Sequence, residues 1–477
     1  MLLIYIVINI LAISALLSLR RNGTAAVSVL AVFAAQVALT AYAFMNPGAT
    51  ELSYFTFDAT GSLMLALLTV VSLPAFVHSA IYVRERDKGL KAACSYFAFL
   101  ILLQFALTMG YLANHIAMTW VFTEVTTLSA AMLVYHHHDK LSLEGAWKYT
   151  FICAISISLV FVGILFLSLS LLHAGSSDLS YASLRAVSGS LDPFWLRLAF
   201  IFIFSGYTAK MGLFPMFTAG IDAKDNAPSP AAALLASVLV NLGFVGIYRA
   251  FSIVAGSSLL PWANAMMITI AVITLLFASA YMIRVRNIKR MLAYSGIEQM
   301  ALVTIGLAMG GVGRYAAILH IVLHTFVKSS LFFHFAQLAR TFRSKMLDDM
   351  GGYFTLNPFG ALVLLLGFFS ITAVPPSGLF VSEFMVFKSM AVNGQWVLLA
   401  AVLLLLTVLI WAFARCIFNI VFMAPPAVLA ESPKGIDAKR CGLWENIIQL
   451  VLLVAAILLA VSSCRREGST YSRSVSH

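Results

Sequence analysis

The chain has 477 residues, of which 61% are hydrophobic and only 10% are charged, and its formal net charge is +11. Soluble domains are about 45–50% apolar and about 25% charged, so this composition excludes a soluble enzyme, a nucleic-acid-binding protein and a secreted disulfide scaffold. We expect the lipid bilayer to be the solvent for most of the chain. The five cysteines are scattered without a CxxC pair, which predicts neither a metal site nor a cofactor in this chain.

Apolar stretches long enough for membrane helices run through the whole chain. A membrane helix needs about 20 mostly apolar residues, and lipid cannot satisfy bare backbone groups, so helices are the natural spanning form. We therefore predict an all-α integral membrane protein with about 14 transmembrane helices. In chain order the predicted helices are 2–19, 24–45, 60–82, 92–112, 115–135, 144–172, 194–218, 228–254, 260–283, 287–309, 314–339, 358–391, 396–423 and 446–463.

Lys and Arg residues in the loops collect on one side of the predicted membrane, as is typical of the cytoplasmic side. Arg20 and Arg21 follow the first apolar stretch instead of preceding it, so this stretch is expected to be a membrane helix and not a cleaved signal peptide. The prediction is a multi-pass protein of a bacterial or archaeal inner membrane, with both termini outside.

Two of the predicted helices, the seventh and the twelfth, are interrupted by proline. Helix 194–218 runs into Phe214-Pro215, and helix 358–391 contains Pro375-Pro376 near its middle. Proline removes a backbone donor and blocks the preceding turn, and broken helices at corresponding places in two halves of a transporter point to ion sites and inverted repeats. The spacing predicts two inverted five-helix repeats, helices 4–8 and 9–13. The alternative is that these prolines only kink structural helices.

These repeats define four predicted parts of the chain. No loop is long enough for a folded soluble domain, the longest being 173–193 and 424–445, so no catalytic residue is expected outside the membrane. In chain order the parts are the N-terminal helices 1–3 over 1–91, the first repeat over 92–254, the second repeat over 260–423, and a C-terminal loop, helix 14 and short tail over 424–477.

Five of the ionisable residues inside predicted helices are singled out, because an ionisable residue at the bilayer centre costs at least about 2.5–3.5 kcal/mol on insertion scales. They are Glu124, Lys210, Glu298, Lys328 and Glu383. Burial favours the neutral form of carboxyl and amino groups, and a nearby opposite charge restores the charged form. A Glu–Lys pair that forms and breaks, such as Glu124 with Lys210, would therefore act as a proton switch. The alternative is a set of static buried salt bridges that fix helix packing, although such pairs stabilise poorly.

His320, His324 and Lys328 are spaced at i, i+4 and i+8, so they lie on one face of a predicted helix. Histidine titrates near pH 6.5, which favours a proton relay over the alternative of histidines bonded to the backbone. Lys148 is interpreted either as a proton entrance or as a lysine that reaches the membrane interface. The run His136–Asp139 could bind a metal, but a solvated turn is favoured because no further ligand spacing supports a site.

Several motifs of the chain together resemble one known family. The motifs are Thr123-Glu124, Ala209–Pro215, Ala227–Leu235, Ile288–Ser295, Phe326–Phe333, Pro375–Gly378 and Ser382–Phe384. With them the whole chain resembles the antiporter-like subunits shared by respiratory complex I, Mrp-type cation/proton antiporters and group 4 membrane-bound hydrogenases. The resemblance implies that Glu124 is the fifth-helix carboxylate and Lys210 the broken-helix lysine paired with it. It also implies that Lys328 is the central connecting lysine and that Glu383 is the twelfth-helix residue facing the exit.

The segment Ser295–Met300 reads S-G-I-E-Q-M and is similar to the S-S-I-E-H-M motif of the hydrogenase-4 and formate hydrogenlyase branch, in its F-type membrane component. Complex I subunits tend to have Ser-His there, without the glutamate. After Pro215 the family usually reads His-x-Trp-Leu-Pro-Asp-Ala-His, of which only Asp222 and Ala223 remain, and Asp222 is kept as a candidate proton-pathway residue. Asn241 stands where several members carry an eighth-helix lysine.

The function that the resemblance implies is proton translocation by a non-catalytic subunit of a multi-subunit, redox-driven membrane complex of the group 4 hydrogenase type. The expected partners are other membrane subunits and a nickel–iron hydrogenase or related redox module, with no nucleic acid. The alternatives are a subunit of an Mrp-type sodium/proton antiporter, an antiporter-like subunit of complex I, and a scaffold subunit that does not pump.

Overall fold

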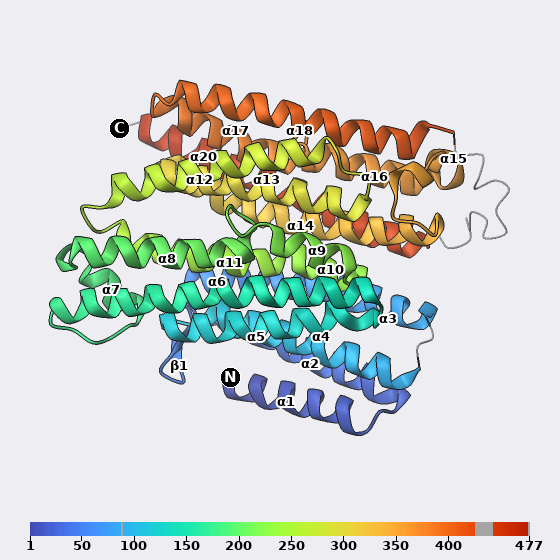
Figure 1. Ribbon diagram of the computed structural model, residues 1–477, viewed down its shortest axis with the longest axis horizontal. Helices are drawn as coiled ribbons and strands as arrows, with labels where there is room; N and C mark the ends of the chain where they lie inside the picture. The colour runs from blue at the N-terminus through green and yellow to red at the C-terminus, as the bar shows by residue number, and fades with distance from the viewer. Residues whose placement is uncertain (87–88, 425–441, 476–477) are drawn as a thin grey trace. The chain divides into compact units, whose positions relative to one another are not determined.

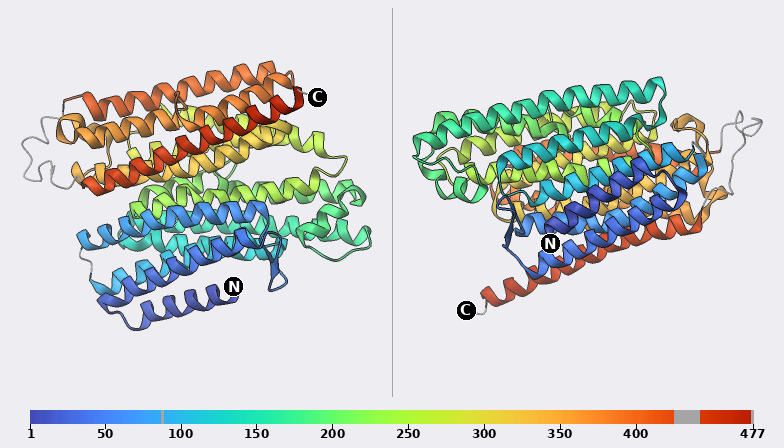
Figure 2. Two further views of the ribbon diagram at one scale, coloured as in Figure 1. Left: turned by 180° about the vertical axis from the view of Figure 1, so that it is seen from behind. Right: turned by 90° about the horizontal axis from the view of Figure 1, so that it is seen from below.

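A computed structural model of the protein describes residues 1–86, 89–424 and 442–475. The chain divides into two compact units, Met1–Asn264 and Ala265–His477, and the boundary falls inside helix α12 (Leu260–Met282). In each unit long helices run roughly alongside one another (Figure 1, Figure 2).

The first unit consists of helices and one small hairpin. The two strands pair antiparallel, with Thr50 opposite Thr56 and Glu51 opposite Phe55, and the Glu51 carboxylate accepts a hydrogen bond from the N-terminal ammonium group at 3.0 Å. The all-α prediction did not include this hairpin, because two-residue strands leave no alternating pattern in a sequence. In chain order the elements are α1 (Leu2–Ser18), α2 (Asn22–Met45), β1 (Thr50–Glu51), β2 (Phe55–Thr56), α3 (Ala59–Arg86), α4 (Leu90–Leu112), α5 (Ile116–Val134), η1 (Tyr135–His137), α6 (Lys140–His173), α7 (Tyr181–Ala186), η2 (Ser188–Ser190), α8 (Pro193–Met211), α9 (Thr218–Asn226), α10 (Ser229–Ala236) and α11 (Val238–Val254).

The second unit contains most of α12 and the remaining helices. Across the described residues, 11 helices are long and apolar enough to cross a membrane, and the apolar helices Leu2–Ser18 and Pro358–Ile371 are shorter. The predicted helical membrane fold is confirmed, whereas the count of fourteen crossings, the inverted repeats and the four-part division stay predictions. The further elements are α13 (Ile288–Met309), α14 (Gly311–Thr341), η3 (Leu347–Asp349), α15 (Tyr353–Leu356), α16 (Pro358–Ile371), α17 (Gly378–Val392), α18 (Trp396–Phe422) and α20 (Leu443–Val475).

Both predicted helix breaks are present. The seventh predicted helix, 194–218, ends early as α8, and the short helix α9 begins only at Thr218; the twelfth is divided into α16 and α17. Gly212 ends α8 in the left-handed conformation with a φ of 85°, and its N–H donates to the carbonyl of Thr208 at 2.7 Å; glycine is favoured there because it has no Cβ. The eighth predicted helix has a further interruption at Ser237, between α10 and α11.

Helices α6 and α8 pack closely because glycines let their backbones approach. A Cβ added at Gly206 of α8 would lie 2.4 Å from the carbonyl oxygen of Ser156 in α6. A Cβ added at Gly163 of α6 would lie 2.9 Å from the carbonyl oxygen of Ala199 in α8. Small residues at helix interfaces are typical of membrane proteins, where van der Waals packing drives association. This seam fixes α8, and therefore its last turn, against α6.

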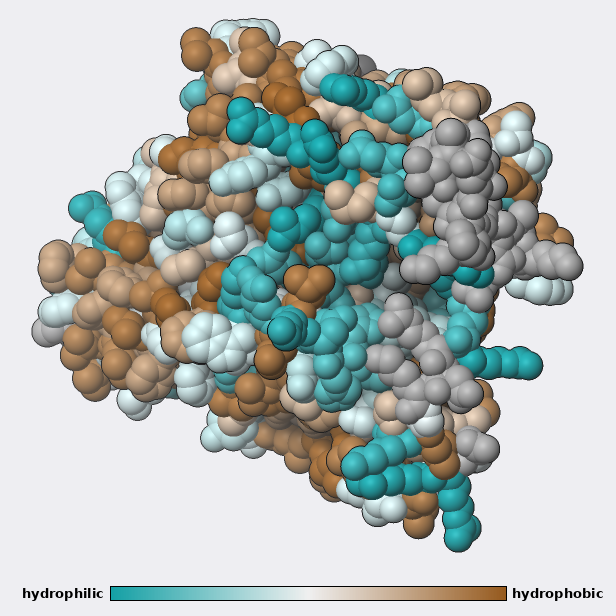
Figure 3. Space-filling view, turned by 45° about the vertical axis from the view of Figure 1, so that its right-hand side comes forward, coloured by the Kyte–Doolittle hydropathy of each residue, from teal (hydrophilic) through white to brown (hydrophobic). Residues whose placement is uncertain are grey.

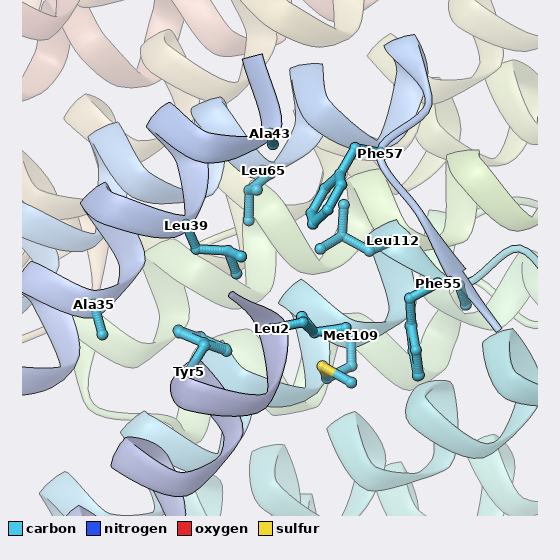
Figure 4. Packing of buried hydrophobic residues seen from close by; sticks show 11 residues of the cluster. Leu2, Tyr5, Ala35, Leu39, Ala43, Phe55, Phe57, Leu65, Met109 and Leu112 are labelled. Carbon is cyan, nitrogen blue, oxygen red and sulfur yellow. The ribbon is translucent and has the colours of Figure 1, made fainter. Parts of the chain in front are cut away.

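An apolar cluster ties the N-terminal helices to the hairpin (Figure 4). Beside Tyr5, the fully buried side chain of Gln36 accepts hydrogen bonds from the Tyr5 hydroxyl at 2.6 Å and from Thr108 and Gln104 at 3.2 Å each. Each polar atom of such a network needs a partner, because lipid and a dry core offer none. The cluster consists of Leu2, Tyr5, Ala35, Leu39, Ala43, Phe55, Phe57, Leu65, Met109, Leu112 and Ala113.

Large apolar side chains are exposed along several helices. Examples are Leu30 on α2, with 68% of its surface exposed, and Val397 and Leu404 on α18, with 85% and 65% exposed. The space-filling view shows broad hydrophobic areas and separate patches where hydrophilic side chains gather (Figure 3). Exposed apolar area of this extent is expected where a protein surface faces lipid.

Candidate functional site

The first unit buries the ammonium group of Lys210 in the last turn of α8, beside the helix break. Its Nζ atom donates to Thr127 Oγ1 of α5 at 2.7 Å and to the Tyr149 hydroxyl of α6 at 3.1 Å. The same atom lies 5.2 Å from the centroid of the Tyr149 ring. Gly243 of α11 closes the site, because a Cβ there would lie 3.0 Å from the Lys210 backbone. Helices α5, α6 and α11 therefore hold this lysine where α8 ends.

Glu124 lies on α5 one turn before Thr127, so both side chains face the same side of the helix. Its carboxylate is half-buried, and its Oε2 atom has no hydrogen-bond partner among the described residues. Lys210 is held by hydrogen bonds to Thr127 and Tyr149. Among the described residues of the first unit, Glu124 and Lys210 do not form an ion pair with each other. Glu124 and Lys210 therefore lie near each other without a direct ion pair, and the hydroxyl group of Thr127 lies between them.

A second buried lysine, Lys224, shares a cavity with Lys210. Lys224 lies on the short helix α9 and is only 7% exposed. Together with Tyr149 and Gly212 the two lysines line a cavity of about 10 Å³, which is roughly the space of one water molecule. In the sequence, Lys224 belongs to the loop Lys and Arg residues that collect on the predicted cytoplasmic side. The only sequence signal for a buried site was its place two residues after Asp222, in the segment that follows the break.

Two other candidates of the first unit lie differently. Lys148 is half-exposed and forms an ion pair with Glu144 at 2.5 Å on the outer face of α6. Its neighbour Tyr149 is the residue that reaches Lys210. Asp222 is half-buried on α9. The role of Lys148 and Asp222 in a proton pathway stays a prediction.

The second unit gathers two carboxyl groups and a histidine around one amide, that of Gln299 on α13. The Gln299 amide nitrogen donates to Glu383 Oε1 at 3.2 Å and, more weakly, to Glu298 Oε1 at 3.4 Å. Its amide oxygen lies 2.5 Å from His320 Nε2, and His320 Nδ1 lies 3.0 Å from Ser382 Oγ. Three helices, α13, α14 and α17, meet here. Gln299 is a site residue that sequence reasoning missed, because a neutral amide carries no charge signal.

Lys328 lies two turns beyond His320 on α14 and is fully buried. Its Nζ atom donates to Ser295 Oγ of α13 at 2.7 Å. Gly296 leaves the room for this contact, because a Cβ there would lie 3.2 Å from Lys328 Cε. His324, also fully buried, lies between His320 and Lys328 on the same helix face. The predicted alignment of the three residues is therefore present.

The chemistry available in both clusters is exchange of protons. Carboxyl, ammonium, imidazole and hydroxyl groups are donors and acceptors that change roles on protonation, and they lie in the interior of helical units with apolar surroundings. Within the described ranges 1–86, 89–424 and 442–475, no group of three or more His, Cys, Asp or Glu side chains could hold a metal ion.

Comparisons with known proteins show which proteins this chain is similar to. A family model described as NADH:quinone oxidoreductase/Mrp antiporter, TM, matches residues 113–409, a range that contains both clusters. The hydrogenase-4 component F homolog of Methylacidiphilum infernorum (isolate V4) is 30% identical over 291 residues, which are 60% of this chain and 61% of that protein. Hydrogenase-4 component B of Escherichia coli (strain K12) is 28% identical over 346 residues, which are 70% of this chain and 50% of that protein. The chain thus spans less than two thirds of the length of these two relatives.

A solved structure has the same fold. A chain of the membrane-bound sulfane sulfur reductase, an archaeal respiratory membrane complex, superposes with a TM-score of 0.83 at 21% identity, covering 97% of this chain and 94% of that one. At this identity the likeness concerns the arrangement of helices alone.

Proposed function

Because the chain belongs to the NADH:quinone oxidoreductase/Mrp antiporter family of transmembrane subunits, we propose that it translocates protons as an antiporter-like subunit of a multi-subunit, redox-driven membrane complex. The observation that carries this proposal is the Gln299 cluster, in which one amide contacts Glu298, Glu383 and His320 in the interior of the second unit. Buried ionisable groups are costly in a membrane protein and usually serve ion or proton transfer.

The first unit supplies the loading step of the proposal. The ammonium group of Lys210 shares a small cavity with Lys224, and Thr127 connects Lys210 to the helix that carries Glu124. When the Lys210 side chain is in its neutral amine form, a proton that reaches Lys224 through water in the break can pass to Lys210, and the charge on Glu124 then favours its retention.

The second unit supplies the release step. Lys328 is bonded to Ser295, and the histidines of α14 continue from it toward Glu383 along one helix face. Glu383 follows the second helix break and is the proposed exit group. In this proposal both chain termini lie outside the membrane, on the side where protons leave.

The redox energy must come from partner subunits. The two relatives reported above are named as hydrogenase-4 components, which supports a hydrogenase-like redox module as the partner. This chain would then supply no cofactor and no electron-transfer step, only the proton path.

The test uses the assembled complex in everted vesicles, with proton uptake followed by a pH-sensitive dye. Lys210→Ala and Glu124→Gln should each abolish proton uptake while the complex remains assembled. Lys388→Gln, a change of an exposed lysine on α17, is the control and should leave uptake intact. Undiminished uptake in assembled Lys210→Ala complexes would refute the proposal.

The Mrp part of the matching family model favours one second candidate, a sodium/proton antiporter subunit. The same vesicles distinguish the two functions without a redox substrate. Sodium-dependent release of a preformed pH gradient would support antiport, whereas proton uptake that requires electron transfer and is indifferent to sodium supports the redox-driven function.

A further inference from the structure

The second unit has an open cleft that belongs to neither cluster of the proposed proton path. It is lined by the end of α12 and the loop that follows it, by the 3-10 helix η3, and by α18. Its volume is about 580 Å³. A cleft of this size is within the range of small-molecule and cofactor sites. Five of the lining residues carry the inference, namely Arg284, Arg286, Asp348, Trp411 and Arg415.

The charge of the cleft is positive. Arg286 forms an ion pair with Asp348 at 3.8 Å, in which both side chains are largely exposed. In the part of the chain that the structure describes, neither Arg284 nor Arg415 takes part in an ion pair. Two guanidinium groups are thus available to an anion that enters the cleft from outside. Guanidinium groups bind phosphate oxygens in a bidentate manner, which makes a phosphate group their natural ligand.

Beside Arg415, α18 carries exposed apolar side chains that continue away from the cleft. Trp411 is 55% exposed and lies one turn before Arg415, on the same face of the helix. Leu404 and Phe418 continue this face at a spacing of seven residues and are 65% and 41% exposed. A tryptophan beside an arginine, with an apolar stripe extending from it along a helix, is typical of the depth where lipid headgroups meet acyl chains.

The position of Arg415 along α18 also places this residue near the expected level of the lipid headgroups. It lies seven residues before Phe422, the last residue of α18, which corresponds to about 10 Å along the helix axis. An arginine side chain at that depth extends toward the interface and keeps its charged end at headgroup level. The three arginines come from the loop after α12 and from α18, so they surround the cleft from two directions.

We propose that this cleft binds one anionic phospholipid, with its phosphate group between Arg284 and Arg415 and its acyl chains along the Leu404–Trp411–Phe418 face of α18. The proposal is independent of proton translocation. Free phosphate satisfies the arginines but not the apolar face, and a neutral phospholipid satisfies the face but leaves the net positive charge uncompensated. Only a ligand with both properties uses the whole cleft.

The experiment uses the purified complex in neutral detergent, with native mass spectrometry to count bound lipid. Phosphatidylglycerol is titrated, and phosphatidylcholine with the same acyl chains and inorganic phosphate are the comparison probes. One phosphatidylglycerol should bind more tightly than phosphatidylcholine, and Arg284→Gln or Arg415→Gln should each weaken that binding about fivefold. Arg21→Gln is the matched control, because Arg21 is exposed in a loop and lines no part of the cleft.

Trp411→Ala separates the lipid from other phosphate sources, since it should weaken phosphatidylglycerol binding and leave inorganic phosphate unaffected. Equal binding of the two phospholipids, or unchanged phosphatidylglycerol binding in both arginine variants, would overturn the proposal. Displacement of the lipid by millimolar inorganic phosphate would also overturn it, in favour of a soluble anion site. Loss of a partner subunit from the arginine variants, with the lipid count unchanged, would instead assign the cleft to a protein contact.

Discussion

Replacing Gln299 by Leu tests whether the amide that joins the ionisable groups of the second unit is needed for proton movement. Leucine is close to glutamine in size, so the change removes the amide and keeps most of the packing. Glu298, Glu383 and His320 all remain, but the group that contacts all three is lost. We expect proton flux to fall at least tenfold, because the carboxyl groups and the imidazole then lack a shared partner.

The structural cost follows from the contacts that disappear. The Gln299 amide bonds Glu383 and the carbonyl of Ile371 at 3.2 Å each and His320 at 2.5 Å, and its 3.4 Å contact with Glu298 is weak. Each buried polar group left without its partner costs about 1–3 kcal/mol. The low end for three such groups is about 3 kcal/mol, which is about a 150-fold change in an equilibrium constant. A measurable decrease in melting temperature should therefore accompany the loss of flux.

The assay measures proton flux per electron transferred in reconstituted vesicles, together with thermal unfolding of the complex. Gln36→Leu is the matched control, because Gln36 is a fully buried glutamine with several hydrogen bonds in the N-terminal helices. It should lower the melting temperature and preserve flux. Gln299→His, which introduces the residue of the similar S-S-I-E-H-M motif, should restore part of the flux. Full flux in assembled Gln299→Leu complexes, or equal loss of flux in Gln36→Leu, would refute the reasoning.

Three further predictions concern the first unit. Lys224→Gln removes one of the two ammonium groups around the cavity shared with Lys210 and should lower proton flux severalfold in everted vesicles with little change in melting temperature; unchanged flux would contradict a role for Lys224. Gly243→Ala places a methyl group 3.0 Å from the Lys210 backbone and should destabilise the protein by about 1–3 kcal/mol through overpacking, which thermal unfolding measures, and a stable variant would show that α11 can move. The hydroxyl of Ser183 donates to Asp178, and this bond holds the pKa of that carboxyl below its usual value. Such a carboxylate stabilises the α7 segment above about pH 4 and loses this effect as the pH falls through its lowered pKa. The hydrogen-exchange protection of α7, corrected for the intrinsic pH dependence of amide exchange, should therefore decrease at low pH, and Asp178→Asn should remove this decrease.

Much of the fold could be predicted because hydropathy and proline act locally. A run of about 20 apolar residues has few alternatives to a membrane helix. Proline inside a helix removes a backbone donor and disfavours the preceding turn, although Pro74 lies within the continuous helix α3. The breaks before α9 and α17 lie at Pro215 and at Pro375-Pro376, where the sequence predicted them. The buried charges Lys210, Lys328 and Glu383 were equally visible, because a charge within an apolar run contradicts its surroundings.

The remaining features depend on contacts between helices that are distant in the sequence. Tyr149 and Thr127 look like ordinary residues of apolar helices, and only the packing of α6 and α5 against the end of α8 gives them a lysine to bind. Lys224 has the sequence context of a solvated loop cation, yet α9 buries it. Gln299 is uncharged, so the cost of placing it in a membrane is too small to single it out.

The glycine seam between α6 and α8 restricts how the protein can work. Gly206 and Gly163 bring the two backbones so close that α6 and α8 are expected to move together as one unit. Displacement of the Lys210 charge is then left to torsions of its own methylene chain and to the short non-helical connection that follows Gly212. Such movements span a few ångströms and occur far faster than the shifts of whole helices. The conformational changes of this subunit during transport would then be small, rapid side-chain reorientations, with α6 and α8 keeping their packing.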